Sequence, residues 1–207
     1  MNKKLVDPYC FPGTNVLRNL PGILDRTELE VFESLSASLA AVDLYKNPPR
    51  LTDLKYLKSI HRTLFGQIYP WAGETRRDLG RMTKTRLNGS VVMYGESAFV
   101  DAALERIFTL LEAENYLQRI PADQFAARTA YFYGEFDAVH PFREGNSRTL
   151  RLFFHGLAHN AGFQLDWAAL AAPESAREDL YAARDRAVMH GDTSTLAALF
   201  ASILSPR

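Results

Sequence analysis

Residues 140–151 read His-Pro-Phe-Arg-Glu-Gly-Asn-Ser-Arg-Thr-Leu-Arg and join two stretches with helical spacing. The second helix is expected to begin at about Ser147. The backbone N–H groups of residues 145–148 would then be unpaired donors at a helix N-terminus, where the helix dipole favours an anion. Arg148 and Arg151 are three residues apart, so they share a face of its first turn and both can bind phosphate oxygens.

Three more residues in this stretch suit phosphate chemistry. Glu144 supplies a carboxylate, a hard oxygen ligand for Mg²⁺ that bridges phosphates. His140 supplies a base whose ordinary pKa lies near neutrality. Gly145 lets the backbone approach a ligand closely. An anion site, a cation ligand, two guanidinium groups and a proton acceptor together indicate phosphoryl or nucleotidyl transfer.

The composition sets bounds on the rest of the chain. Its 207 residues are 47% hydrophobic, which suits one domain with a sizeable core. The 24 basic and 24 acidic residues balance, so no overall charge indicates binding to nucleic acid or to a membrane surface. The single cysteine, Cys10, forms no internal disulfide, and a reducing cytoplasm is the simplest setting. The first residues contain no apolar run of signal-peptide or membrane length, although secretion by another signal stays open.

Hydrophobic spacing predicts an all-α bundle. Residues 1–24 are expected to be irregular. Asp25 is expected to cap the first helix together with Glu28, and Thr52 is expected to cap the second. Gly162 is expected to end the helix that begins at Ser147. The predicted helices span about residues 26–45, 53–66, 96–116, 123–138, 147–161 and 173–189, and a last helix ends at residue 204.

One segment breaks the helical pattern. Asn88-Gly89 lies between two short runs of β-prone residues, and this pair favours the tight turn of a β-hairpin. We therefore expect a two-stranded hairpin within residues 76–95, isolated among helices.

The stretch 140–151 resembles the signature of the Fic (filamentation induced by cAMP) family, HPFx[DE]GNGRxxR, at eight of its nine specified positions. The exception is Ser147, where the signature has a second glycine. Residues 60–62, 69–73 and 76 resemble the helix and turn before the family's active-site flap. Residues 7–9 and 12–17 resemble the amino-terminal arm of bacterial Fic toxins and secreted effectors.

The resemblance implies a single Fic domain over residues 1–207, in which 1–24 is the arm, 76–95 the hairpin flap and 140–151 the active-site loop and helix start. It implies a protein adenylyltransferase, a nucleotidyltransferase that moves AMP from ATP-Mg²⁺ to a hydroxyl of another protein. His140 would be the general base, Glu144 would hold Mg²⁺, and Phe142 would anchor the loop in the core. The residues implied to bind the phosphates are Gly145, Asn146, Ser147, Arg148 and Arg151.

The resemblance also implies roles outside the signature. The hairpin would align a segment of the target by adding a strand to its edge, with contacts from Thr83, Lys84, Thr85, Val91 and Val92. Tyr181 either contacts the nucleobase or is a core aromatic residue. His61 is interpreted as a buried, hydrogen-bonded histidine.

Partners follow from the same resemblance. The target protein would offer a Ser, Thr or Tyr hydroxyl. Some family members carry an inhibitory pattern, [ST]xxxE[GN], but no Ser or Thr of this chain has Glu four residues on. The chain therefore resembles toxins that are inhibited by a separate small antitoxin, which we expect to engage Arg151.

Two alternatives stay open. Because Ser147 departs from the signature, the same site could transfer phosphate or use another nucleotide. The chain could also be a helical effector that acts by binding, without catalysis. Transfer from α-labelled and γ-labelled ATP separates the first alternative from AMP transfer, and the effect of His140→Ala tests the second.

Overall fold

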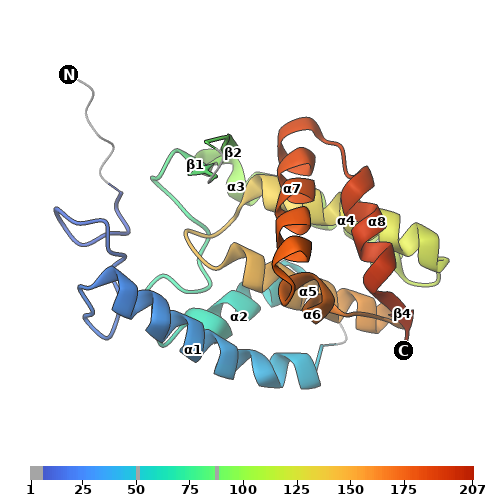
Figure 1. The fold of residues 1–207 in the computed structure, drawn as a ribbon, viewed down its shortest axis with the longest axis horizontal. Coiled ribbons are helices and arrows are strands. Elements are labelled where there is room, and N and C mark those ends of the chain that lie inside the picture. Colours follow the sequence, from blue (N-terminus) through green and yellow to red (C-terminus); the bar gives the residue numbers. More distant parts are fainter. Residues whose placement is uncertain (1–6, 50–51, 87–88) are drawn as a thin grey trace.

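The computed structural model describes residues 7–49, 52–86 and 89–207, and they form a mostly helical fold (Figure 1). The helices are α1 (Arg26–Lys46), α2 (Leu54–Phe65), α3 (Val100–Ala113), α4 (Ala122–Val139), α5 (Asn146–Ala161), α6 (Trp167–Ala171), α7 (Glu174–His190) and α8 (Ser194–Ile203). Short 3-10 turns, η1 (Ser97–Phe99) and η2 (Asn115–Leu117), flank α3. None of the helices in these ranges is both long and apolar enough to cross a membrane.

The expected helix starts and ends are largely found. Asp25 caps α1 by accepting a hydrogen bond from the Glu28 backbone N–H at 2.8 Å. The expectation that Thr52 caps α2 is wrong, because the carboxylate of Asp53 accepts from the Tyr56 N–H at 2.7 Å and α2 begins one residue later. Gly162 ends α5 with a φ of 86°. That left-handed conformation favours glycine.

The hairpin forms from β1 (Arg81–Thr85) and β2 (Val91–Glu96), which pair antiparallel. Asn88 of the expected turn lies outside the described residues, whereas Gly89 has a φ of 82°. A second antiparallel pair, β3 (Phe163–Leu165) with β4 (Leu204–Pro206), was not predicted, and neither was α6. Three-residue strands and a five-residue helix are too short to produce a periodic signal.

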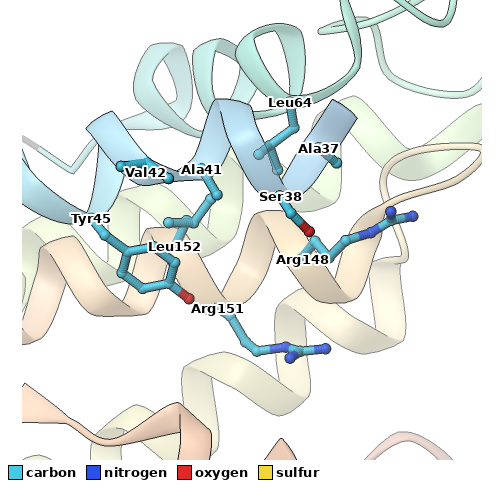
Figure 2. Close-up of a pocket in the computed structure, with 9 residues that line it drawn as sticks. All are labelled: Ala37, Ser38, Ala41, Val42, Tyr45, Leu64, Arg148, Arg151 and Leu152. Atoms are coloured by element: carbon cyan, nitrogen blue, oxygen red, sulfur yellow. The ribbon is translucent and has the colours of Figure 1, made fainter. Parts of the chain in front are cut away.

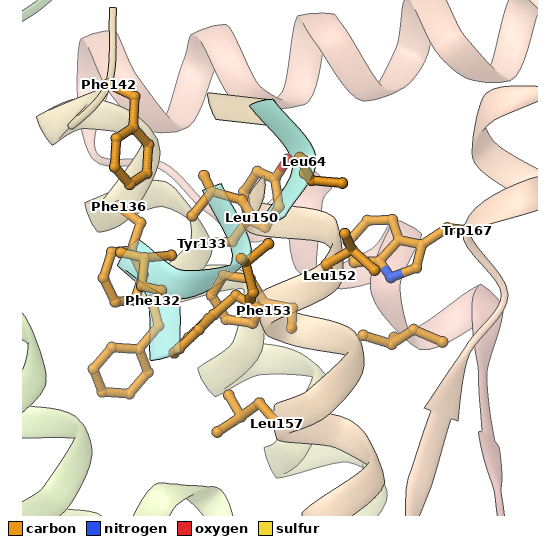
Figure 3. Packing of buried hydrophobic residues seen from close by; sticks show 14 of the residues in the cluster. Leu64, Phe132, Tyr133, Phe136, Phe142, Leu150, Leu152, Phe153, Leu157 and Trp167 are labelled. Carbon is orange, nitrogen blue, oxygen red and sulfur yellow. The ribbon is translucent and has the colours of Figure 1, made fainter. Parts of the chain in front are cut away.

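Helices α4 and α5 form the centre of the core. Figure 3 shows Phe132, Tyr133 and Phe136 of α4 close to Leu150 and Phe153 of α5. All five side chains are at most 1% exposed. The aromatic rings meet largely edge to face, the geometry that ring quadrupoles prefer. This packing fixes the C-terminal end of α4 and the N-terminal end of α5, which are joined by residues 140–145.

Replacement of Phe153 tests the importance of this packing. The fully buried ring contacts Phe108, Phe136 and Phe154. We expect Phe153→Ala to lower the free energy of unfolding by about 3–5 kcal/mol, because it removes apolar contacts and leaves a cavity. The matched control is Phe99→Ala, at a site 68% exposed, with an expected change within about 0.5 kcal/mol. Equal losses in urea unfolding would contradict this description of the core.

Candidate active site

Two residues with a left-handed backbone conformation shape the loop between α4 and α5. His140 ends α4 with a φ of 48°, and Gly145 precedes α5 with a φ of 78°. Thr149 is the first residue whose N–H bonds back along the helix, to the Gly145 carbonyl at 3.0 Å. The N–H groups of residues 146–148 therefore lie at the open N-terminus of α5, which is the expected anion site.

The side chain of Asn146 stiffens the loop. Its Oδ1 accepts a hydrogen bond from the Phe142 N–H at 2.9 Å, and its Nδ2 donates to the Phe142 carbonyl at 2.7 Å. Because both polar atoms of the side-chain amide are hydrogen-bonded to Phe142, Asn146 can offer a ligand its backbone N–H rather than its side chain. Phe142 itself is fully buried, as expected.

His61 of α2 packs against the same loop. Its ring stacks on Phe142 with centroids 3.9 Å apart. The Gly73 N–H donates to Nδ1 at 2.8 Å, so Nε2 carries the proton and donates to the Glu144 carbonyl at 3.0 Å. Burial lowers the pKa of His61 to about 4, which keeps the ring neutral. The interpretation of His61 as a buried, hydrogen-bonded residue is confirmed.

Arg76 joins the loop to the hairpin. Its fully buried guanidinium donates to the carbonyls of His140 at 2.7 Å, Gly80 at 2.9 Å and Val139 at 3.0 Å, and also to that of Gly95. Sequence reasoning noted Arg76 only as part of a resemblance and missed this role. No local pattern could have revealed it, because the four carbonyls come from three separate segments.

His140 lies between the hairpin and α4. Its ring stacks on Tyr94 of β2 with centroids 3.8 Å apart, and its side chain is 13% exposed. Its Nδ1 is 3.5 Å from Oδ1 of Asp137. Burial lowers the pKa of His140, while the carboxylate of Asp137 opposes that shift. The imidazole is therefore suited to accept a proton at neutral pH.

The two arginines of the signature extend from the first turns of α5. Figure 2 shows both guanidinium groups directed toward the same end of a pocket between α1 and α5. The pocket has a volume of about 260 Å³, and Ala37, Ala41 and Tyr45 line its α1 side. Arg148 pairs with Glu33 of α1, and Arg151 donates from Nη2 to Ser147 Oγ at 3.3 Å. His140 does not line this pocket.

Glu144 meets the simplest requirement for a Mg²⁺ ligand. Its side chain is 44% exposed, and one carboxylate oxygen accepts from the Gly145 N–H at 2.9 Å. Mg²⁺ at phosphate sites is commonly held by one or two carboxylates plus the substrate phosphates. The described residues contain no group of three or more His, Cys, Asp or Glu side chains that could hold a metal without a ligand's help. The donor set therefore fits Mg²⁺ brought with a nucleotide.

The hairpin and α7 present the remaining predicted residues. Thr83, Lys84, Thr85 and Val91 are exposed, as a docking edge requires. Val92 is 2% exposed, so its side chain faces the interior rather than a docked segment. Tyr181 of α7 is 36% exposed, and the guanidinium carbons of Arg86 and Arg184 lie 5.5 and 5.6 Å from its ring centroid.

The family model for the Fic/DOC family matches residues 51–158. The chain belongs to the Fic/DOC family, so the prediction of a Fic fold with a small hairpin is confirmed.

Two curated relatives are named as adenylyltransferases. The chain is 38% identical over 175 residues to "Protein adenylyltransferase VbhT" of Bartonella schoenbuchensis. The matched region covers 84% of this chain but only 35% of VbhT, so the chain spans about a third of that protein's length. It is 36% identical over 165 residues to "Probable protein adenylyltransferase y4lH" of Sinorhizobium fredii, covering 79% and 81% of the two chains. The prediction of a Fic-type nucleotidyltransferase is confirmed at the level of the family.

A similar solved structure is that of BepC, a VirB-translocated effector protein of Bartonella tribocorum, with bound AMPPNP. The TM-score is 0.83 at 25% sequence identity, and the match covers 99% of both chains.

Substitution of Gly145 tests the tight packing of the loop. A Cβ at this position would lie 2.3 Å from two ring atoms of Phe65. We expect Gly145→Ala to lower the free energy of unfolding by about 2 kcal/mol more than Gly162→Ala, because overpacking adds to backbone strain. Gly162 is the matched control, since it has a φ of 86° and no heavy atom within 4 Å of the added Cβ. Similar losses for both variants in urea unfolding would refute the clash.

Proposed function

We propose that the chain is a protein adenylyltransferase, which transfers AMP from ATP to a hydroxyl of a Ser, Thr or Tyr side chain in a target protein. The observation that carries the proposal is the single loop that joins His140 to the open N-terminus of α5 with Arg148 and Arg151. This arrangement provides a proton acceptor and an anion site within one rigid unit. The names of the curated relatives and the AMPPNP bound to BepC support the same activity.

The chemistry follows from the residues. The target hydroxyl oxygen attacks the α-phosphorus of ATP, and His140 accepts the hydroxyl proton. The bond from the α-phosphorus to the oxygen that bridges to the β-phosphate breaks, and pyrophosphate leaves. The open backbone N–H groups of residues 146–148 and the guanidinium of Arg148 stabilise the developing charge, and Arg151 orients the γ-phosphate. Glu144 would hold Mg²⁺, which neutralises phosphate charge when it is bound.

The hairpin supplies an edge for the target. Among the described residues, β1 pairs only with β2, so its other edge is open to an extended segment. The exposed side chains of Thr83, Lys84 and Thr85 lie along that strand. Strand addition would bring a target hydroxyl toward His140, because Tyr94 of the paired strand stacks on that imidazole.

Replacement of His140 tests the proposed activity. We expect His140→Ala to lower the transfer of label from α-labelled ATP to protein in a bacterial lysate by at least about 100-fold, since general-base catalysis contributes on this scale. γ-Labelled ATP should give no label transfer beyond that of the lysate without this chain. The matched control is His190→Ala, at an exposed position, which should keep full transfer. Transfer of γ-label instead would favour a phosphotransferase, and equal labelling by His140→Ala would exclude catalysis by His140.

We also propose that a small antitoxin protein binds the pocket between α1 and α5. Arg151 lines this pocket, so its guanidinium can meet a carboxylate of such a partner. Beside the pocket, Val31, Leu35 and Leu39 form an exposed apolar stripe on α1, with side chains 56–77% exposed. A partner helix that covers this stripe and places a carboxylate against Arg151 would exclude the γ-phosphate.

A groove-filling variant tests this partner. Ala41→Arg places a long cation in the α1 wall of the pocket. We expect it to weaken binding of a small protein encoded beside this chain by at least about 10-fold, because the long side chain occupies the groove that the partner must enter. Label transfer by Ala41→Arg should then resist that protein, whereas the control Ala113→Arg on α3 should stay inhibited. Equal inhibition of both variants would place the partner elsewhere.

A further inference from the structure

A buried ion pair next to His140 links α4 to α7. Arg184 donates from Nε to Asp137 Oδ2 at 2.9 Å and from Nη2 to Oδ1 at 2.8 Å. The two residues are 4% and 1% exposed. Burial alone would raise the pKa of Asp137, but the charge and hydrogen bonds of Arg184 hold that pKa well below its usual range. Asp137 is therefore an ionised carboxylate, which only accepts hydrogen bonds.

The same carboxylate faces the imidazole. Its Oδ1 lies 3.5 Å from His140 Nδ1, and Nδ1 is buried without a hydrogen-bond partner among the described residues. An acceptor-only neighbour favours the tautomer with the proton on Nδ1. That tautomer leaves the lone pair on Nε2, the nitrogen that must accept a proton from a target hydroxyl.

Arg184 also contacts the residue that departs from the signature. Its Nη1 donates to Ser147 Oγ at 3.3 Å, and Arg151 Nη2 donates to the same oxygen at 3.3 Å. A glycine at position 147 would lack both contacts. The chain of contacts thus runs from His140 through Asp137, Arg184 and Ser147 to Arg151, and it joins the base to the phosphate-binding arginine.

We infer that Asp137 is a positioning residue that holds His140 in its Nδ1–H tautomer, and that Arg184 couples this unit to Ser147 and Arg151. The catalytic part of this inference rests on the proposed adenylyltransferase activity. Asp137 and Arg184 need not touch the substrate. Buried ion pairs also occur as purely structural links, so the test needs readouts that loss of a structural link would not change.

The first readout is independent of activity. ¹⁵N NMR of the histidine side chains reports which ring nitrogen carries the proton, and His140→Gln assigns the signal of His140. We expect Nδ1–H in the unchanged chain and a shift toward Nε2–H in Asp137→Asn, because the amide can donate to Nδ1. Nε2–H in the unchanged chain, or the same tautomer in both proteins, would overturn the inference. A chain that transfers no AMP would refute the proposed function, yet this measurement would still decide the role of Asp137.

The second readout is kinetic. We expect Asp137→Asn to lower kcat roughly 10- to 100-fold, with a change in KM for ATP within about threefold. The acid limb of the kcat profile should move to lower pH, because loss of the carboxylate lowers the pKa at which His140 becomes neutral. The other titratable or charged groups that face His140 stay in place, namely Arg184 of α7, Tyr94 of β2, Glu144 of the loop and Arg76, which binds the His140 carbonyl.

Two further variants separate positioning from folding. Asp137→Asn leaves Arg184 unpaired in the interior, whereas Asp137→Asn with Arg184→Gln removes both buried charges. We expect the double variant to recover stability while its kcat stays low. If the double variant has the kcat of the unchanged chain, the Asp137–Arg184 pair is only a structural link. The control Glu114→Gln breaks the ion pair with Arg128, and should leave both kcat and the acid limb unchanged.

Discussion

A buried guanidinium without a carboxylate partner among the described residues holds the active-site region together. Arg76 binds carbonyl oxygens from the end of α4, from the segment before β1 and from β2. A single rigid fork of donors binds all four of these oxygens, and the Gly80 carbonyl also accepts from the Ser97 N–H at 3.1 Å. The left-handed turn at His140 and the base of the hairpin are therefore stabilised by the same side chain, so their relative position does not depend on solvent.

Much of this architecture could be predicted from sequence because it depends on local chemistry. The Asp25 cap, the helix end at Gly162 and the helical spacing of α5 each depend on residues only a few positions apart. The signature at 140–151 is contiguous. Thr52 misled the assignment because an equally good cap, Asp53, follows it. The partners of Arg76, Asp137 and Arg184 could not be predicted, since each contact joins segments that meet only after the helices pack.

Ser147 illustrates how tertiary context changes the meaning of a departure from a family pattern. In sequence, a side chain in place of glycine predicts a loss of backbone freedom. In the structure, Ser147 lies in the first turn of α5, and its hydroxyl accepts from two guanidinium groups. The residue that needs a positive φ is Gly145 instead. The serine therefore gives this chain an additional connection between α5 and α7.

The hairpin is held at both of its ends. Arg76 binds its base, and Arg86 near its tip forms an ion pair with Asp185 of α7. An edge that is rigid before binding loses little conformational entropy when a segment pairs with it, but main-chain pairing is nearly blind to side-chain identity. If target segments pair with this edge as proposed, the enzyme would accept many extended sequences there. Its selectivity must then come from surfaces of the target that lie beyond the strand, so a short peptide would be a poor substitute for the folded substrate protein.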